Sequence, residues 1–243
     1  MYRKIRSKLV ILGNRKPYKK EVQDLLRHVE KKNWIYFNMR LEGSQISLDN
    51  LETILTEDKL VDLPLEDLIL LRNLEGLYEN LGLWAEERRP LSRKVMGAIY
   101  QALTGEEPKL RKHQPTVIEW SYSPIFASEI EEAIDGLIEM SKEETFDVLD
   151  QAINLHNQFL KIFPFNQANQ LVARCVMTYY TLYQGLPVPC GDIREEEYNE
   201  ILWVELNKGW KNKDASRSGL YEYVGQGVLD MLNLADNLTA EYR

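Results

Sequence analysis

Apolar residues recur every three or four positions along most of the chain, with charged residues between them. This spacing is typical of amphipathic helices that bury one face. The pattern predicts helices at about 17–43, 47–55, 68–83, 90–104, 128–138, 141–162, 171–183, 192–202 and 220–238. We therefore expect an all-α protein.

Two segments depart from the helical pattern. Residues 9–12 (Leu-Val-Ile-Leu) precede Gly13 and Asn14, which predicts a short strand that ends in a turn. Residues 115–122 combine β-branched and aromatic side chains, which favours an extended segment or one small hairpin.

Arg174 lies in the most apolar of the predicted helices. Between residues 171 and 183 only Arg174, Thr178 and Thr181 are not apolar, so we expect this helix to be largely buried. An unpaired internal charge costs several kcal/mol even after relaxation. The sequence therefore predicts a partner for Arg174 elsewhere in the chain.

Glu42 lies at the end of the first long predicted helix, directly before Gly43, which fits a helix C-cap. A carboxylate at that end is disfavoured by the helix dipole by a few tenths of a kcal/mol or more. This misfit predicts a cation near Glu42.

Composition indicates a globular chain that stays out of the membrane. The 243 residues are 44% hydrophobic and 28% charged, as in ordinary soluble proteins. No apolar run approaches the roughly 20 residues that cross a bilayer, and the run behind the basic N-terminus is too short for a signal peptide. Cys175 and Cys190 form no disulfide framework or metal pattern, so we expect reduced thiols and a cytoplasmic location.

The net charge of −8 is unevenly distributed. Residues 1–20 contain eight Lys or Arg and no acid, while the remainder has 22 basic and 38 acidic residues. This balance argues against a nucleic-acid-binding protein. The basic arm is interpreted as a solvated terminus or as one neutralised by the chain's own acidic surface; the alternative is contact with an anionic partner.

Residues 163–174 read Phe-Pro-Phe-Asn-Gln-Ala-Asn-Gln-Leu-Val-Ala-Arg. This segment resembles, without a gap, the Fic family signature H-P-F-x-[D/E]-G-N-G-R-x-x-R. The flanking pieces extend the resemblance over about residues 35–205. They are the lead-in helix 152–162, the following segments 182–187 and 194–198, the flap-like 122–130, and the inhibitory-type motif 38–43.

The resemblance implies a Fic-like (Fido) helical domain with at most a small β-hairpin flap. Residues 1–75 would form an N-terminal region whose inhibitory-type helix covers about 17–43. Residues 76–205 would form the Fic-like core, and 206–243 a helical C-terminal extension.

The signature has lost its catalytic devices. Phe163 stands where the family has the histidine that takes a proton from a target hydroxyl, and a phenyl ring has no lone pair for that task. Gln167 replaces the acidic residue that holds Mg²⁺, which favours carboxylates. Ala168 and Gln170 replace the glycines that let the backbone approach phosphates, and Leu171 replaces the first arginine. No catalytic residue is therefore predicted.

Four signature residues remain, namely Pro164, Phe165, Asn169 and Arg174. The first two are structural by their chemistry. Asn169 is interpreted as a helix N-cap rather than an anion ligand. The resemblance implies that Asn169 and Arg174, together with Gln167, line a vestigial nucleotide or anion pocket.

The segment Asn38-Met-Arg-Leu-Glu42-Gly43 is similar to the family's inhibitory motif [S/T]-x-x-x-E-[G/N]. In the family this glutamate pairs with the second arginine of the signature. The resemblance thus implies that Glu42 pairs with Arg174, which agrees with the two misfits noted above. A bidentate pair would satisfy both groups, and we expect a structural role for it.

Other candidate residues have two interpretations each. Trp120 and Tyr122 form either a target-docking flap or part of the core. His156 is more consistent with a hydrogen-bonded core residue than with a catalytic one. The remaining histidines have no metal-ligand spacing, so no metal site is predicted.

The sequence favours a catalytically degenerate Fic-like pseudoenzyme that binds a protein partner. The alternatives are a Fido-fold transferase with altered chemistry and residual protein AMPylation. We expect no cofactor; ATP and Mg²⁺ enter only if the altered motif still binds nucleotide. We expect neither nucleic acid nor a membrane span, and the oligomeric state is left open.

Overall fold

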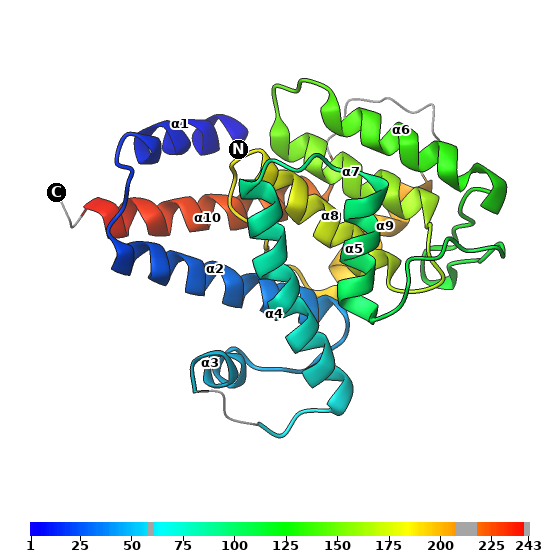
Figure 1. Cartoon of the computed structure of the whole chain (residues 1–243), viewed down its shortest axis with the longest axis horizontal. Helices are drawn as coiled ribbons and strands as arrows, with labels where there is room; N and C mark the ends of the chain where they lie inside the picture. The colour runs from blue at the N-terminus through cyan, green and yellow to red at the C-terminus, as the bar shows by residue number, and fades with distance from the viewer. Residues whose placement is uncertain (58–60, 208–217, 241–243) are drawn as a thin grey trace.

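The computed structural model describes residues 1–57, 61–207 and 218–240, which form ten α-helices and two short 3₁₀ helices (Figure 1). The helices are α1 Tyr2–Gly13, α2 Lys20–Leu41, α3 Leu48–Glu57, α4 Leu65–Glu86, α5 Arg93–Thr104, η1 Ile118–Trp120, η2 Ala127–Glu129, α6 Ile130–Lys142, α7 Val148–Ile162, α8 Asn169–Tyr183, α9 Glu195–Asn207 and α10 Leu220–Ala240. These residues contain no sheet, which confirms the all-α prediction.

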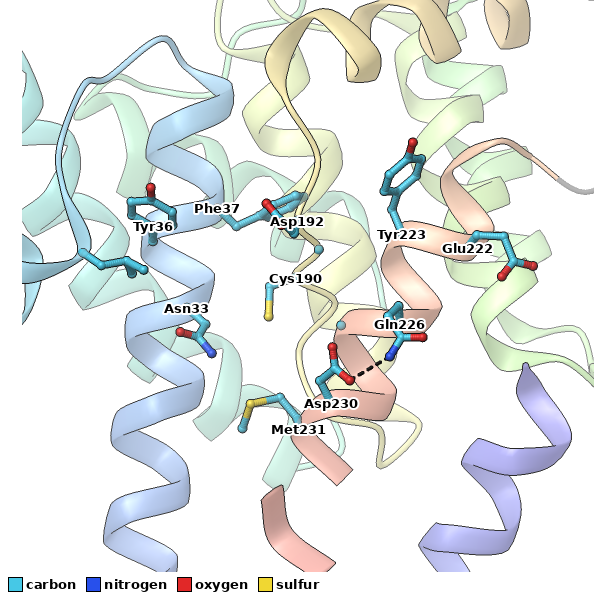
Figure 2. A pocket seen from close by; sticks show the side chains of 13 residues that line it. Asn33, Tyr36, Phe37, Cys190, Asp192, Glu222, Tyr223, Gln226, Asp230 and Met231 are labelled. Atoms are coloured by element: carbon cyan, nitrogen blue, oxygen red, sulfur yellow. Dashed lines mark hydrogen bonds between the residues drawn. The ribbon is translucent and has the colours of Figure 1, made fainter. Parts of the chain in front are cut away.

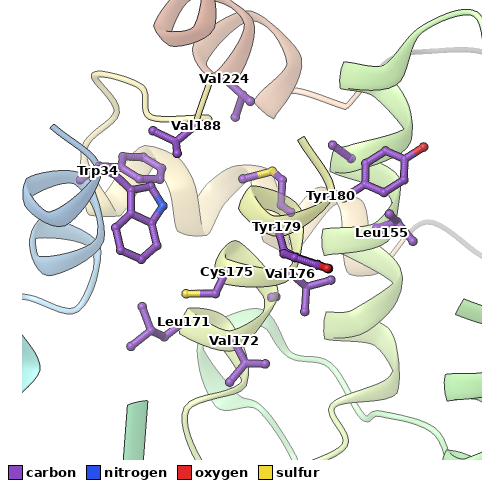
Figure 3. Packing of buried hydrophobic residues seen from close by; sticks show 14 of the residues in the cluster. Trp34, Leu155, Leu171, Val172, Cys175, Val176, Tyr179, Tyr180, Val188 and Val224 are labelled. Carbon is purple, nitrogen blue, oxygen red and sulfur yellow. The ribbon is translucent and has the colours of Figure 1, made fainter. Parts of the chain in front are cut away.

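Helix α8 forms the centre of the molecule, packed against α7 along its length and against α4 and α5 on its other sides. Every residue from Leu171 to Thr181 is buried, as the lack of a polar face predicts. Figure 3 shows Trp34 of α2, Val188 of the loop between α8 and α9, and Val224 of α10 around this helix. The apolar interior therefore surrounds the helix that carries Arg174.

The first and last helices lie side by side, because α1 packs along α10, and α10 also contacts α2 and α7 (Figure 1). Asp236 of α10 accepts hydrogen bonds from Lys8 Nζ at 2.8 Å and from Arg15 Nη1 at 2.7 Å. The acidic surface of the chain thus neutralises part of the basic N-terminal arm.

The predicted strand at residues 9–12 is wrong, because these residues belong to α1. The buried side chains Tyr2, Ile5 and Leu12 share one helical face, whereas Val10 and Ile11 are exposed. The short apolar run was ambiguous between strand and helix, and packing against α10 favours the helix.

The segment 115–122 makes a single antiparallel bridge between Val117 and Tyr122, whose backbones exchange hydrogen bonds of 2.8 and 3.2 Å. The 3₁₀ helix η1 fills the space between them, with Ser121 in the left-handed region. The expected hairpin is therefore reduced to one tight turn.

Several helix ends follow their sequence signals. Ser92 Oγ accepts a hydrogen bond from Val95 N, and Gly105 and Gly43 adopt positive φ angles of 73° and 85° after α5 and α2. Helix α4 runs without interruption across residue 75, the boundary expected between N-terminal region and core. Within the described residues, none of the helices is both long and apolar enough to span a bilayer.

Candidate functional site

The loop 163–168 between α7 and α8 holds the degenerate signature. Two non-glycine residues in it have left-handed backbones, Phe163 with φ 50° and Ala168 with φ 57°. A Cβ atom disfavours this region, whereas glycine adopts it freely. Ala168 therefore retains the backbone conformation that suits the glycine of the family signature, although its side chain does not.

Asn169 fastens this loop to the start of α8. Its side-chain oxygen accepts a hydrogen bond from Phe165 N at 2.9 Å, and its side-chain nitrogen donates one to Phe165 O, also at 2.9 Å. Asn169 is the first residue of α8, and Ala168 occupies the N-cap position, so the N-cap interpretation is wrong. Because the amide is buried and bonded on both sides, it is not offered to an anion.

Arg174 bonds two residues of α2. Its Nε donates to Asn38 Oδ1 at 2.9 Å, and its Nη2 donates to Glu42 Oε1. The Arg174 side chain is 1% exposed and that of Glu42 is 29% exposed. Glu42 is the C-cap of α2 and Gly43 follows with its positive φ, so the structure places the inhibitory-type motif directly against the signature arginine.

This contact is the end of a regular polar seam between α2 and α8. Trp34, Asn38 and Glu42 follow one another at intervals of four residues, as do Arg174 and Thr178 opposite them. Trp34 Nε1 donates to Thr178 Oγ1 at 2.9 Å. Positions four apart share a helix face, so the two polar stripes meet along their length.

The charge state of Arg174 follows from its neighbours. Burial alone would lower the pKa of the guanidinium, but the Glu42 carboxylate and Tyr198 raise that pKa above its ordinary value. The guanidinium carbon also lies 5.5 Å from the centre of the Tyr198 ring. Arg174 therefore stays protonated and is neutralised inside the protein.

His156 lies beside the same tyrosine and is completely buried. Its Nε2 is 2.8 Å from Tyr198 Oη, and its Nδ1 is 2.9 Å from Asn157 Oδ1. Burial lowers the pKa of His156 to about 4, so the imidazole is neutral near pH 7. These are the contacts of a hydrogen-bonded core histidine.

Arg111 is a buried arginine that the sequence analysis missed. Its guanidinium donates to four backbone carbonyls and to no carboxylate. The carbonyls belong to His113, Ile125, Ile162 and Phe163. Burial lowers the pKa of this guanidinium. Its bonds join the C-terminal end of α7 to the segment 111–125. An isolated arginine in a polar loop gives no sequence pattern that would reveal this role.

Gln167 lies exposed at the tip of the loop. Its neutral amide is a poor anchor for Mg²⁺, and the described residues contain no cluster of three or more His, Cys, Asp or Glu that could hold a metal. Asn169 and Arg174 are already engaged within the protein. The residues present do not fit a magnesium–nucleotide complex.

The docking interpretation of Trp120 and Tyr122 is not supported. Trp120 is fully buried and its Nε1 donates to Asn199 Oδ1 at 3.2 Å, while Tyr122 Oη donates to Lys161 O at 3.1 Å. These side chains hold the segment against α9 and α7. The exposed apolar side chains nearby are Ile118 and Phe126, at 82% and 67% exposure.

The fold is that of Fic domain structures. It matches a Fic domain containing signaling protein from Bacteroides thetaiotaomicron with a TM-score of 0.72 and 17% identity, covering 98% of this chain and 92% of the other. It also matches Fic-1 from C. elegans (TM-score 0.67, 15% identity, 99% and 70% coverage). A Fic family protein from Desulfovibrio desulfuricans gives a TM-score of 0.65 at 18% identity, with 98% and 72% coverage.

The sequence comparison agrees with the fold. Residues 87–181, which run from α5 through most of α8 and include the whole signature loop, match the model of the Fic/DOC family. No curated protein matched the chain. Residues 87–181, less than half of the chain, are therefore similar to the Fic/DOC family in sequence, and the whole chain is similar to Fic domain structures in fold.

Proposed function

We propose that this chain is a catalytically degenerate Fic protein that binds a protein partner and transfers no nucleotide. The observation that carries the proposal is Phe163. Its position in the signature belongs to the residue that accepts a proton from the target hydroxyl, and its side chain has no basic atom. Its carbonyl oxygen accepts a hydrogen bond from Arg111 Nε at 2.7 Å, which holds this loop in place around an inert residue.

The polar seam between α2 and α8 supports the same conclusion. Arg174 is the one arginine left in the signature, and Asn38 and Glu42 satisfy its Nε and Nη2. An anion would have to displace the Glu42 carboxylate and would meet only one arginine. We infer that Glu42 serves the fold here rather than gating a reaction.

A transferase with altered chemistry is the alternative, and it has few polar groups to use. Asn169 is bonded on both sides of its amide, and His156 is buried between Tyr198 and Asn157. Gln167 is exposed but has neither a charge nor a nucleophilic atom. None of these groups combines exposure with basicity.

The partner-binding part rests on the surface near the segment that resembles the target-docking flap. Ile118 and Phe126 expose large apolar side chains there. Such exposure mainly signifies interaction when the residues form part of a larger patch. A cytoplasmic setting fits the two free, buried cysteines, Cys175 and Cys190.

A labelling experiment tests the loss of transferase activity. Wild type and Glu42→Gly are incubated with cell lysate, Mg²⁺ and each of the four α-labelled ribonucleoside triphosphates. We expect no label in protein for either chain, because the base is missing even when the arginine is released. Label that enters protein with Glu42→Gly alone would favour the altered-chemistry alternative.

A restored chain is the matched control. Phe163→His, Gln167→Glu, Ala168→Gly, Gln170→Gly and Leu171→Arg together rebuild the family signature on this scaffold, and Glu42→Gly in the same chain releases Arg174. Label transfer by that chain would show that the assay detects activity on this fold.

For the binding role, proteins retained by immobilised wild type are expected to be lost with Ile118→Asp/Phe126→Asp.

A further inference from the structure

A cleft of about 660 Å³ opens between α2, α10 and the loop 188–194, on a side of the molecule that the signature does not reach. Figure 2 shows α2 as one wall, α10 as the other and the loop with Cys190 and Asp192 between them. Five of the thirteen residues that line it have aromatic or aliphatic side chains. They are Tyr36, Phe37, Leu48, Tyr223 and Met231. The volume lies within the range of clefts that bind ligands, about 300–1,000 Å³.

Tight packing holds one wall of this cleft in place. A Cβ atom built on Gly227 would lie 1.2 Å from Cys190 O, and one built on Gly191 would lie 2.9 Å from Tyr223 O. The loop therefore lies directly on α10, where only glycine leaves room for it. The cleft is a formed surface feature of the α2–α10 contact.

Its charged lining groups are all acidic. Asp192 lies on the loop, and Glu222 and Asp230 lie on α10 (Figure 2). Among the described residues, no Lys, Arg or His forms a salt bridge with these three carboxylates; Asp230 accepts only a hydrogen bond from Gln226. An apolar floor with an uncompensated acidic rim suits an occupant that carries both cationic and apolar side chains.

The outer face of α1 has that chemistry. Arg3, Ser7, Val10 and Ile11 follow the spacing i, i+4, i+7 and i+8, so they share one face opposite the buried Tyr2–Ile5–Leu12 face. Val10 and Ile11 are 66% and 42% exposed. Lys4 is exposed beside this face. The exposed cations Arg3 and Lys4 thus lie on or beside the same outer surface of α1 as the exposed Val10 and Ile11.

We propose that the outer face of α1 from one copy of this chain docks in the α2–α10 cleft of a second copy. A chain cannot fill its own cleft, because α1 lies on the far side of α10 from α2 (Figures 1 and 2). The contact joins two different surfaces, so each bound pair of copies leaves one α1 and one cleft open. Such head-to-tail contacts close into rings or continue as open chains.

Sedimentation velocity at low and high salt tests the proposal. In about 0.01 M salt, where charges act over about 30 Å, the average mass of wild type is expected to rise with protein concentration. In about 1 M salt, where that range is about 3 Å, the protein is expected to return to monomers. A wild type that stays monomeric at both salt concentrations would overturn the proposal.

Two variants that fail separately and combine when mixed identify the surfaces. Arg3→Gln/Val10→Gln removes the α1 face, and Asp192→Asn/Asp230→Asn removes the acidic rim. Each variant alone is expected to be monomeric. An equal mixture is expected to form dimers that grow no further, because only one intact α1 and one intact cleft remain. A mixture without dimers would contradict the pairing.

Glu131→Gln/Glu132→Gln is the control, since it removes the same number of carboxylates from the exposed face of α6; it is expected to associate like wild type. Circular dichroism melting shows that each variant is folded. A monomeric wild type whose cleft binds an added synthetic Arg-Val-Leu-rich peptide would assign the cleft to a foreign segment and overturn docking of a second copy.

Discussion

Arg174 and Arg111 are both nearly fully buried, at 1% and 3% exposure, but they bond different kinds of partner, and Arg174 Nη1 has no hydrogen-bond partner among the described residues. Arg174 faces a carboxylate and an amide, so its charge is neutralised. Arg111 faces only carbonyl oxygens at the end of α7, where the helix dipole favours a cation. Each arginine gives up its hydration to bond two segments of the chain. Removing the partners of either arginine therefore leaves a buried charge without compensation.

Glu42→Ala is expected to lower the free energy of unfolding by about 2 kcal/mol, less than for a fully buried pair because Glu42 is 29% exposed. For a chain of this size that corresponds to a fall in Tm of about 4–8 °C. Calorimetric melting measures it, with the exposed Glu200→Ala as the control. Equal melting of Glu42→Ala and wild type would show that the pair contributes nothing.

His156 predicts a pH dependence of stability. Its pKa in the folded chain is about 4, below its ordinary value of 6.5, so the unfolded chain binds a proton first as the pH falls. Its contribution is complete above about pH 6.5 and is lost toward pH 4, by about 2 kcal/mol between about pH 7 and pH 5. Urea unfolding of wild type and His156→Gln at both pH values measures this loss, and an unchanged pH dependence in the variant would contradict the assignment.

At the scale of elements, α7, the signature loop and α8 form one unit that two other segments hold in place. Arg111 joins the segment 111–125 to the end of α7. The seam from Trp34 to Glu42 joins α2 to α8. The loop keeps the two left-handed residues of its backbone, Phe163 and Ala168, although neither is glycine. The loop thus keeps a backbone conformation that suits glycine, with other residues in those positions.

Arg111→Met is expected to destabilise the fold by about 3 kcal/mol and to release the segment 111–125, because a methionine cannot donate to its carbonyls. Hydrogen exchange of the backbone amides, followed by mass spectrometry, should show faster exchange in that segment. Arg93→Met is the control. Arg93 makes its salt bridges to Glu131 and Asp135 on the exposed surface, so its loss should matter less.

The sequence predicted most of the helices because their apolar spacing is regular. It pointed to Glu42 and Arg174 because a carboxylate at a helix C-terminus and a charge on a buried helix are each unfavourable without a partner. It failed where partners leave no pattern. Carbonyl oxygens hold Arg111, so no charged residue signals its burial. The amide of Asn169 bonds Phe165, four residues before it, which an N-cap rule does not anticipate. Residues 9–12 are too short for periodicity to separate strand from helix.

In the whole molecule, residues 87–181 match the Fic/DOC family model, and the terminal helices α1 and α10 lie side by side. Helix α2 takes part in two features. Its C-terminal end covers Arg174, and its middle forms one wall of the α2–α10 cleft. The signature region is closed from within, whereas the cleft is open and acidic. We infer that this protein now acts through its surfaces.

The central claim is that the signature no longer forms a nucleotide site. Isothermal titration calorimetry of wild type and Glu42→Ala with ATP and Mg²⁺ tests it most directly, with the restored-signature chain as the comparison. We predict no saturable heat for either chain, because Asn169 remains bonded to Phe165 when Arg174 is freed. Saturable binding of ATP by wild type or by Glu42→Ala would contradict the account.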